Sequence, residues 1–169
     1  MMFETPRLET QRLVLRSMCM DDWPSYCTMM GTGRSKYMGG PFDHPAAWGM
    51  FCQDIAQWHL FGVGALMIDE KSSGRCVGQV GINSGPLFPE YELGWFVYGD
   101  TEGKGIAFEA AQILRNWAFA ERGLSTLVSY IDPENDRSIA LAERLGAVLD
   151  QTAQRPDPTD LVFRHKHPA

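Results

Sequence analysis

The stretch YELGWFVYGDTEGKGIAFEA, residues 91–110, limits the folds open to this chain more than any other segment. Aromatic and aliphatic residues continue to Tyr98, glycines interrupt them, and apolar residues then recur at helical spacing over 105–122. A strand, a glycine-rich turn and a helix in this order leave the free N–H groups of the first helical turn beside a loop without bulky side chains. The arrangement is typical of a main-chain site for phosphate groups.

The rest of the chain adds more strands than helices to this unit. Periodicity and turn residues predict strands over 7–18, 63–69, 75–82, 89–98 and 124–131, and one or two more around Val148 and 160–165. They predict helices over 20–30, 44–60, 105–122 and 133–146, and a glycine-rich loop over 31–45. Hairpins followed by one β-α-β-α unit favour an α+β fold with a mixed, mostly antiparallel sheet.

Length and charge exclude several classes of protein. With 169 residues, the chain suits one domain with a hydrophobic core and is short for two. A formal net charge of −6 gives no support to nucleic-acid binding, which needs a basic face. No apolar run has the length of a membrane span, and the first residues lack the apolar region of a signal peptide.

Cysteine and histidine spacing predicts neither disulfides nor a metal site. The four cysteines show no C-x-x-C pattern, so we expect reduced thiols packed as small apolar groups in a cytoplasmic protein. The four histidines have no metal-ligand spacing with cysteines or carboxylates. The terminal RHKH, residues 164–167, is expected to be a solvated tail.

Two common nucleotide motifs fit the glycine turn poorly. A Walker loop needs four residues between its first glycine and the Gly-Lys pair, whereas only three separate Gly99 from Gly103, and Gly105 replaces the hydroxyl ligand. A dinucleotide fingerprint meets Phe108 where its third glycine belongs, although Asp132 stands where a ribose-binding acid would. A third interpretation fits better: the N–H groups of 103–107 hold a pyrophosphate, and the preceding strand offers its main chain to a pantetheine arm.

Three segments together resemble the GCN5-related N-acetyltransferase (GNAT) superfamily: ELGWFVYGDTEGKGIAFEA, then NDRSIALAERLG, and the leading LETQRLVLRSM. The leading segment is similar to the branch that acetylates protein N-termini, the ribosomal-protein type. The resemblance covers nearly the whole chain. It implies a single domain over 1–169, with splayed central parallel strands, helices on both faces and acetyl-CoA in a V-shaped cleft. It also implies acetyl transfer to a primary amine, of a protein N-terminus or a small molecule, by direct attack and without a metal.

The resemblance assigns cofactor-binding residues. It implies main-chain contacts of Phe96 and Val97 with pantetheine, and a contact of Asn135 with the CoA arm, which Asn135 can combine with capping its helix. It implies that pyrophosphate is bound by the main chain of Gly103, Lys104, Gly105, Ile106 and Ala107. Each of these residues also has a plain structural explanation, in a β-α turn, in core packing or in a cap.

The resemblance also assigns the chemistry. Glu92 is expected to be the general base, with Glu90 as its substitute, and Ser138 to serve the departing thiolate. The N–H group near Val97 would polarise the thioester carbonyl. Glu92 and Ser138 can equally be ordinary polar residues. The side chains around loop 31–45 that would wall the acceptor site are Tyr37, Phe42 and Trp48, although core packing explains Trp48 equally well.

This chain departs from the family pattern at two positions. Glu102 stands where Gln or Arg is usual, and we expect it to face solvent or to pair with Lys104. Ala142 stands where many members carry a tyrosine that protonates the thiolate. Two alternatives stay open: a non-catalytic CoA-binding module of the same fold, and, with less support, a nicotinamide-dinucleotide-binding protein. The oligomeric state is also open, a homodimer being common for such folds.

Overall fold

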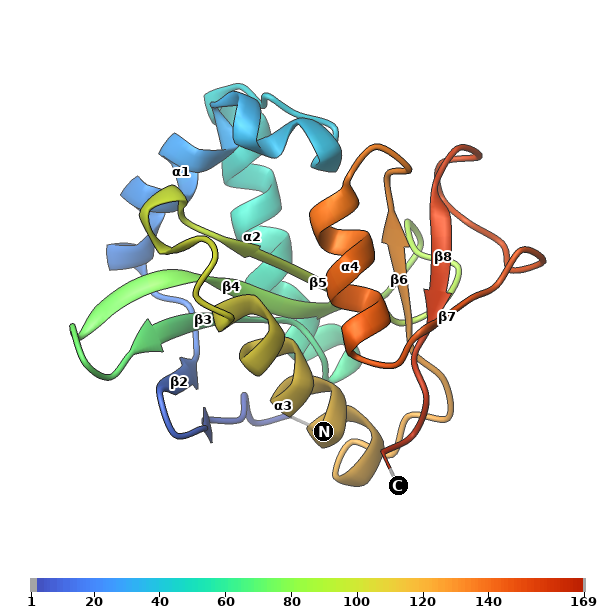
Figure 1. The fold of residues 1–169 in the computed structure, drawn as a ribbon. Coiled ribbons are helices and arrows are strands. Elements are labelled where there is room, and N and C mark those ends of the chain that lie inside the picture. Colours follow the sequence, from blue (N-terminus) through green and yellow to red (C-terminus); the bar gives the residue numbers. More distant parts are fainter. Residues whose placement is uncertain (1–2, 169) are drawn as a thin grey trace.

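One mixed sheet organises the part of the chain that the computed structural model describes, residues 3–168, with strand order β1-β2-β3-β4-β5-β6-β8-β7 (Figure 1). Its strands are Leu8–Glu9 (β1), Leu13–Arg16 (β2), Ala65–Glu70 (β3), Arg75–Asn83 (β4), Glu92–Val97 (β5), Val128–Ile131 (β6), Val148–Leu149 (β7) and Leu161–Arg164 (β8). The α-helices are Trp23–Met30 (α1), His44–Phe61 (α2), Ile106–Ala120 (α3) and Asp136–Arg144 (α4). Short 3₁₀ helices are Met20–Asp22 (η1), Gly33–Met38 (η2) and Gly99–Thr101 (η3).

The sheet is antiparallel except at its centre, where β5 and β6 run parallel. Their ladder has one registered pair, Glu92 with Val128, beside which the Val128 N–H donates to the Tyr91 carbonyl over 3.0 Å. Next to this pair the Ser129 hydroxyl donates to the Leu93 carbonyl over 2.6 Å. Farther along, no main-chain to main-chain hydrogen bond between residues 3–168 joins β5 to β6. The predicted α+β fold, with a mostly antiparallel sheet and splayed central parallel strands, is confirmed.

Helices cover both faces of the sheet, as expected, with α3 and α4 on one face and α1 and α2 on the other (Figure 1). Helix α3 contributes small and branched side chains to the main hydrophobic core, namely Ile106, Ala110, Ala111, Leu114 and Ala118. A second cluster under α1 and α2 includes Tyr26, Met30 and Phe51. The small alanines let α3 pack closely against the sheet. The packed helix and β5 hold the two ends of the glycine turn that connects them.

Two sequence predictions about local structure are wrong. The expected strand over 7–18 is a hairpin of β1 and β2. The chain turns between them because the Thr10 N–H donates to the Leu13 carbonyl and the Thr10 hydroxyl accepts from the Leu13 N–H. The expected loop over 31–45 contains η2, in which the buried Ser35 hydroxyl donates to the Met30 carbonyl over 2.8 Å. Such short elements have too few residues for a periodic signal.

The cysteine prediction holds only in part. All four thiols are free, but Cys19 and Cys52 are exposed rather than packed.

Among the helices of residues 3–168, none combines the length and the apolar composition that a membrane span needs.

The segment at the end of β8 passes the point where β5 and β6 separate, so the prediction of a solvated RHKH tail is wrong for Arg164, which belongs to β8, and for His165. Its side chain is 4% exposed, and its Nε2 lies 2.8 Å from the Ser129 hydroxyl oxygen. Since that hydroxyl donates to the Leu93 carbonyl, Nε2 must carry the proton and donate to Ser129. Burial, with a smaller effect of the Arg115 charge, lowers the pKa of His165 to about 4.

We predict that His165 makes the fold sensitive to acid. Its folded pKa of about 4 lies below the usual 6.5, so its neutral form stabilises the fold above pH 6.5 and this contribution is lost as pH falls to 4. His165→Gln keeps a donor near Ser129 but does not titrate. Relative to this variant, the wild type should lose about 3 kcal/mol of unfolding free energy across that window. Urea denaturation at several pH values measures the difference. An equal dependence of the unfolding free energy on pH in both proteins would contradict the prediction.

Candidate active site

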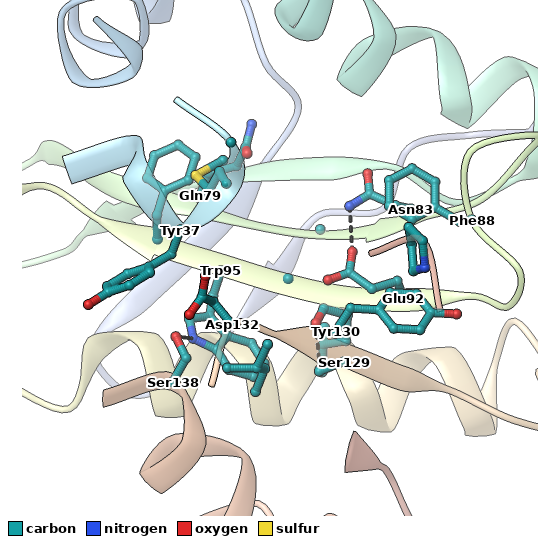
Figure 2. Close-up of a pocket in the computed structure, with 18 of the residues that line it drawn as sticks. Tyr37, Gln79, Asn83, Phe88, Glu92, Trp95, Ser129, Tyr130, Asp132 and Ser138 are labelled. Carbon is teal, nitrogen blue, oxygen red and sulfur yellow. Dashed lines mark hydrogen bonds between the residues drawn. The ribbon is translucent and has the colours of Figure 1, made fainter. Parts of the chain in front are cut away.

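A cavity of about 500 Å³ lies beside the splayed strands (Figure 2). β5 and β6 contribute its floor, η2 and α2 lie along one side, and the loop 156–160 closes another. Aromatic rings from five parts of the chain line it, namely Tyr26, Tyr37, Phe88, Trp95, Phe96 and Tyr130. Its charged side chains are Lys36, Asp54, Glu92, Asp132, Asp157 and Asp160. The cavity is therefore both aromatic and acidic.

Glu92 lies in this cavity, with its side chain on the face of β5 that looks toward α2. It is 9% exposed, and its Oε2 accepts a hydrogen bond from Asn83 Nδ2 over 2.7 Å (Figure 2). The Asn83 Oδ1 in turn accepts from Gln57 Nε2 over 3.0 Å, which fixes the amide orientation. Burial raises the pKa of Glu92 to about 7, against the lowering effect of the Asn83 hydrogen bond. A carboxyl group with this pKa can take up and release a proton near neutral pH.

Sequence reasoning missed a second buried carboxyl group, Asp54 on α2. Its Oδ2 accepts from the Tyr26 hydroxyl over 3.0 Å and from Gln79 Nε2 over 3.1 Å. Burial raises the pKa of Asp54 to about 6. A signal did exist: Asp54 falls between Phe51 and Trp58 at helical spacing, on the apolar side of α2, where an acid needs a partner.

Glu90, the expected substitute for Glu92, takes part in an ion pair instead. Arg164 donates to its two carboxylate oxygens over 2.8 and 3.0 Å. These hydrogen bonds hold the pKa of Glu90 below its usual value. Glu90 is also absent from the lining of the acidic cavity. The geometry therefore favours Glu92 over Glu90 as a proton acceptor.

A second cavity, of about 540 Å³, adjoins the first at Trp95, Phe96, Asn135 and Ser138. It is lined by η2, by the loop and first turn over 101–108, and by the start of α4. Gly103 has φ +76° and Gly105 φ +74°, a conformation that disfavours side chains with a Cβ. No oxygen of residues 3–168 accepts a hydrogen bond from the main-chain N–H groups of 103–108. The loop thus has the free donors that an anion would need.

Of the five predicted loop residues, all but Lys104 line this cavity. The Lys104 carbonyl accepts from Arg12 Nη1 over 2.9 Å. The expectation for Glu102 is wrong, because this carboxylate neither faces solvent alone nor pairs with Lys104. It pairs with Arg34 and Arg137, each over 2.5 Å, because η2 and α4 bring both guanidinium groups to the loop. These contacts hold the pKa of Glu102 below its usual value.

The main chain of β5 presents alternate residues to the gap between the splayed strands. The Tyr98 N–H donates to the Val77 carbonyl in β4, and the register places Phe96 opposite Gln79. Since bonding directions alternate along a strand, Phe96 uses its main chain in the β4 ladder, whereas Trp95 and Val97 face the gap. Of the two predicted contacts, the geometry thus leaves only the Val97 N–H free for a ligand, because the Val97 carbonyl accepts from Arg34, and it adds Trp95.

Asn135 and Ser138 lie together at the start of α4, where the two cavities meet. The Asn135 Oδ1 accepts from the Ser138 N–H over 3.2 Å, so the predicted cap is confirmed. The Ser138 Oγ accepts from Trp95 Nε1 over 3.2 Å, which ties α4 to β5 (Figure 2). Ala142 is fully buried and supplies no acid.

Of the three aromatic residues expected to wall an acceptor site, only Tyr37 lines a cavity, and it lines both. Phe42 packs against the cluster under α1 and α2. Trp48 stacks on Phe51 with ring centroids 5.8 Å apart but is 42% exposed, so it packs at the surface and not in the core. Within the described part of the chain, no three His, Cys, Asp or Glu side chains are grouped to hold a metal ion.

Comparisons with known proteins agree with this architecture. The profile of the acetyltransferase (GNAT) domain matches residues 12–148. An acetyltransferase from Agrobacterium tumefaciens str. C58 is 55% identical, with a TM-score of 0.95 over 98% of this chain and 96% of that chain. The ribosomal-protein-S5-alanine acetyltransferase from Vibrio fischeri shares the fold at 16% identity, with a TM-score of 0.68 over 95% of each chain. The uncharacterized protein YkkB of Bacillus subtilis (strain 168) is 29% identical over 108 residues, and the match spans 63% of its length.

The chain therefore belongs to the acetyltransferase (GNAT) domain family, a class of N-acetyltransferases. The resemblance seen in its glycine turn and in its α4 segment is confirmed, and its solved neighbours include ribosomal-protein acetyltransferases.

We predict that Asn83→Ala raises the pKa of Glu92 above 7. The variant removes the larger of the two hydrogen bonds that favour the ionised carboxylate, whereas burial, the largest effect on this pKa, remains. A pH titration of the Glu92 carboxyl carbon by NMR measures the change. Gln57→Ala is the matched control, because it removes the partner of Asn83 but leaves the Asn83–Glu92 hydrogen bond. An unchanged pKa in Asn83→Ala would contradict the prediction.

Proposed function

We propose that this protein transfers the acetyl group of acetyl-CoA to a primary amine, of a protein N-terminus or of a small molecule. One observation carries the proposal: free loop N–H groups and a carboxyl group with a pKa of about 7 lie in two cavities that meet at β5. One cavity suits a phosphate-bearing cosubstrate, and the other suits an amine.

Acetyl-CoA would lie with its pyrophosphate on the N–H groups of Gly103 to Ala107, at the positive end of α3. The positive φ of both loop glycines supports this, because a main chain without Cβ atoms can approach a ligand closely. The pantetheine arm would follow the main chain of Trp95 and Val97 into the gap. Its thioester would then reach the junction near Ser138 and Asn135.

The acceptor amine would reach the junction from the acidic cavity. It arrives as an ammonium ion, so Glu92 first accepts a proton, directly or through water. The amine nitrogen then attacks the thioester carbon, whose oxygen takes up negative charge beside the N–H group of Val97. When the carbon–sulfur bond breaks, the attacking nitrogen gives up its second proton and the departing thiolate gains one, passed through the Ser138 hydroxyl, which is reprotonated in the same step, or through solvent. No covalent acyl-enzyme is required.

The charge of the acidic cavity supports an ammonium-bearing acceptor. Lys36 is the one basic side chain among the described residues that line it, against the five carboxyl groups. Aromatic faces around the cavity also attract cations. A thiol-release screen with acetyl-CoA across peptide N-termini and small amines would identify the acceptor.

The four free thiols support the prediction of a cytoplasmic enzyme.

A CoA-binding module without activity is the second candidate, favoured by one observation. Ala142 leaves α4 without the tyrosine acid that many family members carry. Both candidates bind CoA, but only the enzyme releases thiol in the presence of an amine. Stabilisation by NAD and not by CoA in thermal unfolding would exclude both and favour a dinucleotide-binding protein.

We predict that Glu92→Gln lowers kcat/KM about 100-fold, the usual contribution of a general base. In the wild type, activity should rise with pH through about 7, because Glu92 must be ionised to accept a proton. The variant should lose this rise of activity with pH, the acid limb of the pH–activity profile, but retain CoA affinity. Glu90→Gln is the matched control and should keep the limb, because Glu90 is ion-paired outside the cavity. Wild-type activity in Glu92→Gln would refute the base assignment.

We predict that Gly103→Ala weakens CoA binding about fivefold. The added Cβ meets no atom within 4 Å, but φ +76° is strained for alanine by about 1 kcal/mol, so the loop must shift. Gly123→Ala is the matched control, because its glycine has φ +72°, equal free space and no part in either cavity. Calorimetric titration with CoA compares the two variants. Equal affinities would show that the loop does not hold the cofactor.

A further inference from the structure

We infer that the Glu102 carboxylate is an internal substitute for the CoA pyrophosphate, and that Arg34 and Arg137 bind that pyrophosphate once it displaces Glu102. The inference rests on the proposed CoA site. It adds two cofactor-binding side chains and a residue that competes with the cofactor for them.

Three separate elements meet at Glu102. Its Oε1 pairs with Arg34 Nη2, from η2, and its Oε2 pairs with Arg137 Nη1, from α4, each over 2.5 Å. Both oxygens of the carboxylate are thus engaged, one by each guanidinium group. A diphosphate offers the same kind of acceptor with more oxygens and more charge.

The surroundings of this cluster are basic, although the chain as a whole has a net charge of −6. Among the described residues, the charged side chains that line the second cavity are Arg34, Lys36, Arg137, Arg144 and Glu102. Four are positive and one is negative. Glu102 is therefore the one anion in a cavity whose remaining charges favour an anionic ligand.

The position of Glu102 connects it to the free loop donors. It directly precedes Gly103, the first residue of the segment whose N–H groups have no acceptor among residues 3–168. Its side chain is 27% exposed, so a solute can reach the carboxylate. An anion that settles on these N–H groups must therefore compete with Glu102 for the same two guanidinium groups.

The two arginines are held ready in different ways. Arg34 Nη2 also donates to the Val97 carbonyl over 2.9 Å, which anchors it beside β5 without Glu102. The Arg137 side chain is 76% exposed, and its ion pair with Glu102 draws it over the cavity. Glu102 therefore keeps the arginines in place and prevents their mutual repulsion, but each contact must break when a phosphate takes over. Breaking these contacts reduces the apparent affinity for CoA.

The opposing explanation is a structural clamp, in which Glu102 ties η2 to α4 and thereby shapes the cavity. The two explanations predict opposite effects of Glu102→Gln on CoA binding. Loss of a competitor increases the affinity, whereas loss of a clamp decreases it.

Calorimetric titration of the full chain with CoA, at low and high salt, tests the inference. Glu102→Gln should bind CoA about fivefold more tightly, because two partly exposed ion pairs no longer compete. Arg137→Gln should bind CoA about fivefold more weakly, and the double variant should lose the gain of Glu102→Gln. The gain should shrink at high salt. Dephospho-CoA should show the same gain, since the pyrophosphate is the proposed partner.

Asp100→Asn is the matched control. Asp100 lies two residues before Glu102 and loses the same charge, but it pairs with Arg75 over 2.8 Å and does not line the cavity. Weaker or unchanged binding in Glu102→Gln, an equal gain in Asp100→Asn, or a gain absent with dephospho-CoA would overturn the inference. If the wild type does not bind CoA at all, the proposed function fails instead.

Discussion

The separation of β5 from β6 is the constraint on which the rest of this structure depends. The two strands share one registered pair, and the Ser129 hydroxyl then joins them once more before they part. The His165 side chain, directly after β8, contacts the same hydroxyl from the other side and so helps to fix the point of separation. Because the strands part, the Trp95 and Val97 main chains face a gap instead of a ladder, and two cavities meet there.

Charge is divided between these two cavities in a way that suits transfer from an anion to a cation. The acidic cavity holds Glu92 and Asp54, whose pKa values burial raises toward neutrality. The other cavity holds basic side chains around the free N–H groups of the glycine turn. Opposite charges on the two sides of β5 would guide a phosphate-bearing molecule and an ammonium ion to the same junction. Glu102 is the exception, since it places an acid among the basic groups.

Sequence reasoning succeeded where a local pattern carries the structure. The order of strands and helices, the Asn135 cap and the glycine turn follow from periodicity and from residue types within a few positions. It failed where the partner of a side chain is remote in sequence. The Glu102–Arg34 pair, the Ser129–His165 hydrogen bond and the Asp54–Tyr26 hydrogen bond join elements that no short pattern relates. Short elements such as η2 also left no periodic signal.

By itself, the sequence determined the family, the mixed α+β fold and a loop of glycines that can expose its N–H groups, because backbone conformation depends on nearby residues. Only the tertiary structure decided which carboxyl groups could accept a proton. Glu90 and Glu92 are two residues apart, yet one pairs with Arg164 and the other is buried beside Asn83. The pKa of each depends on desolvation and on charges brought from distant elements, and these exist only once the chain has folded.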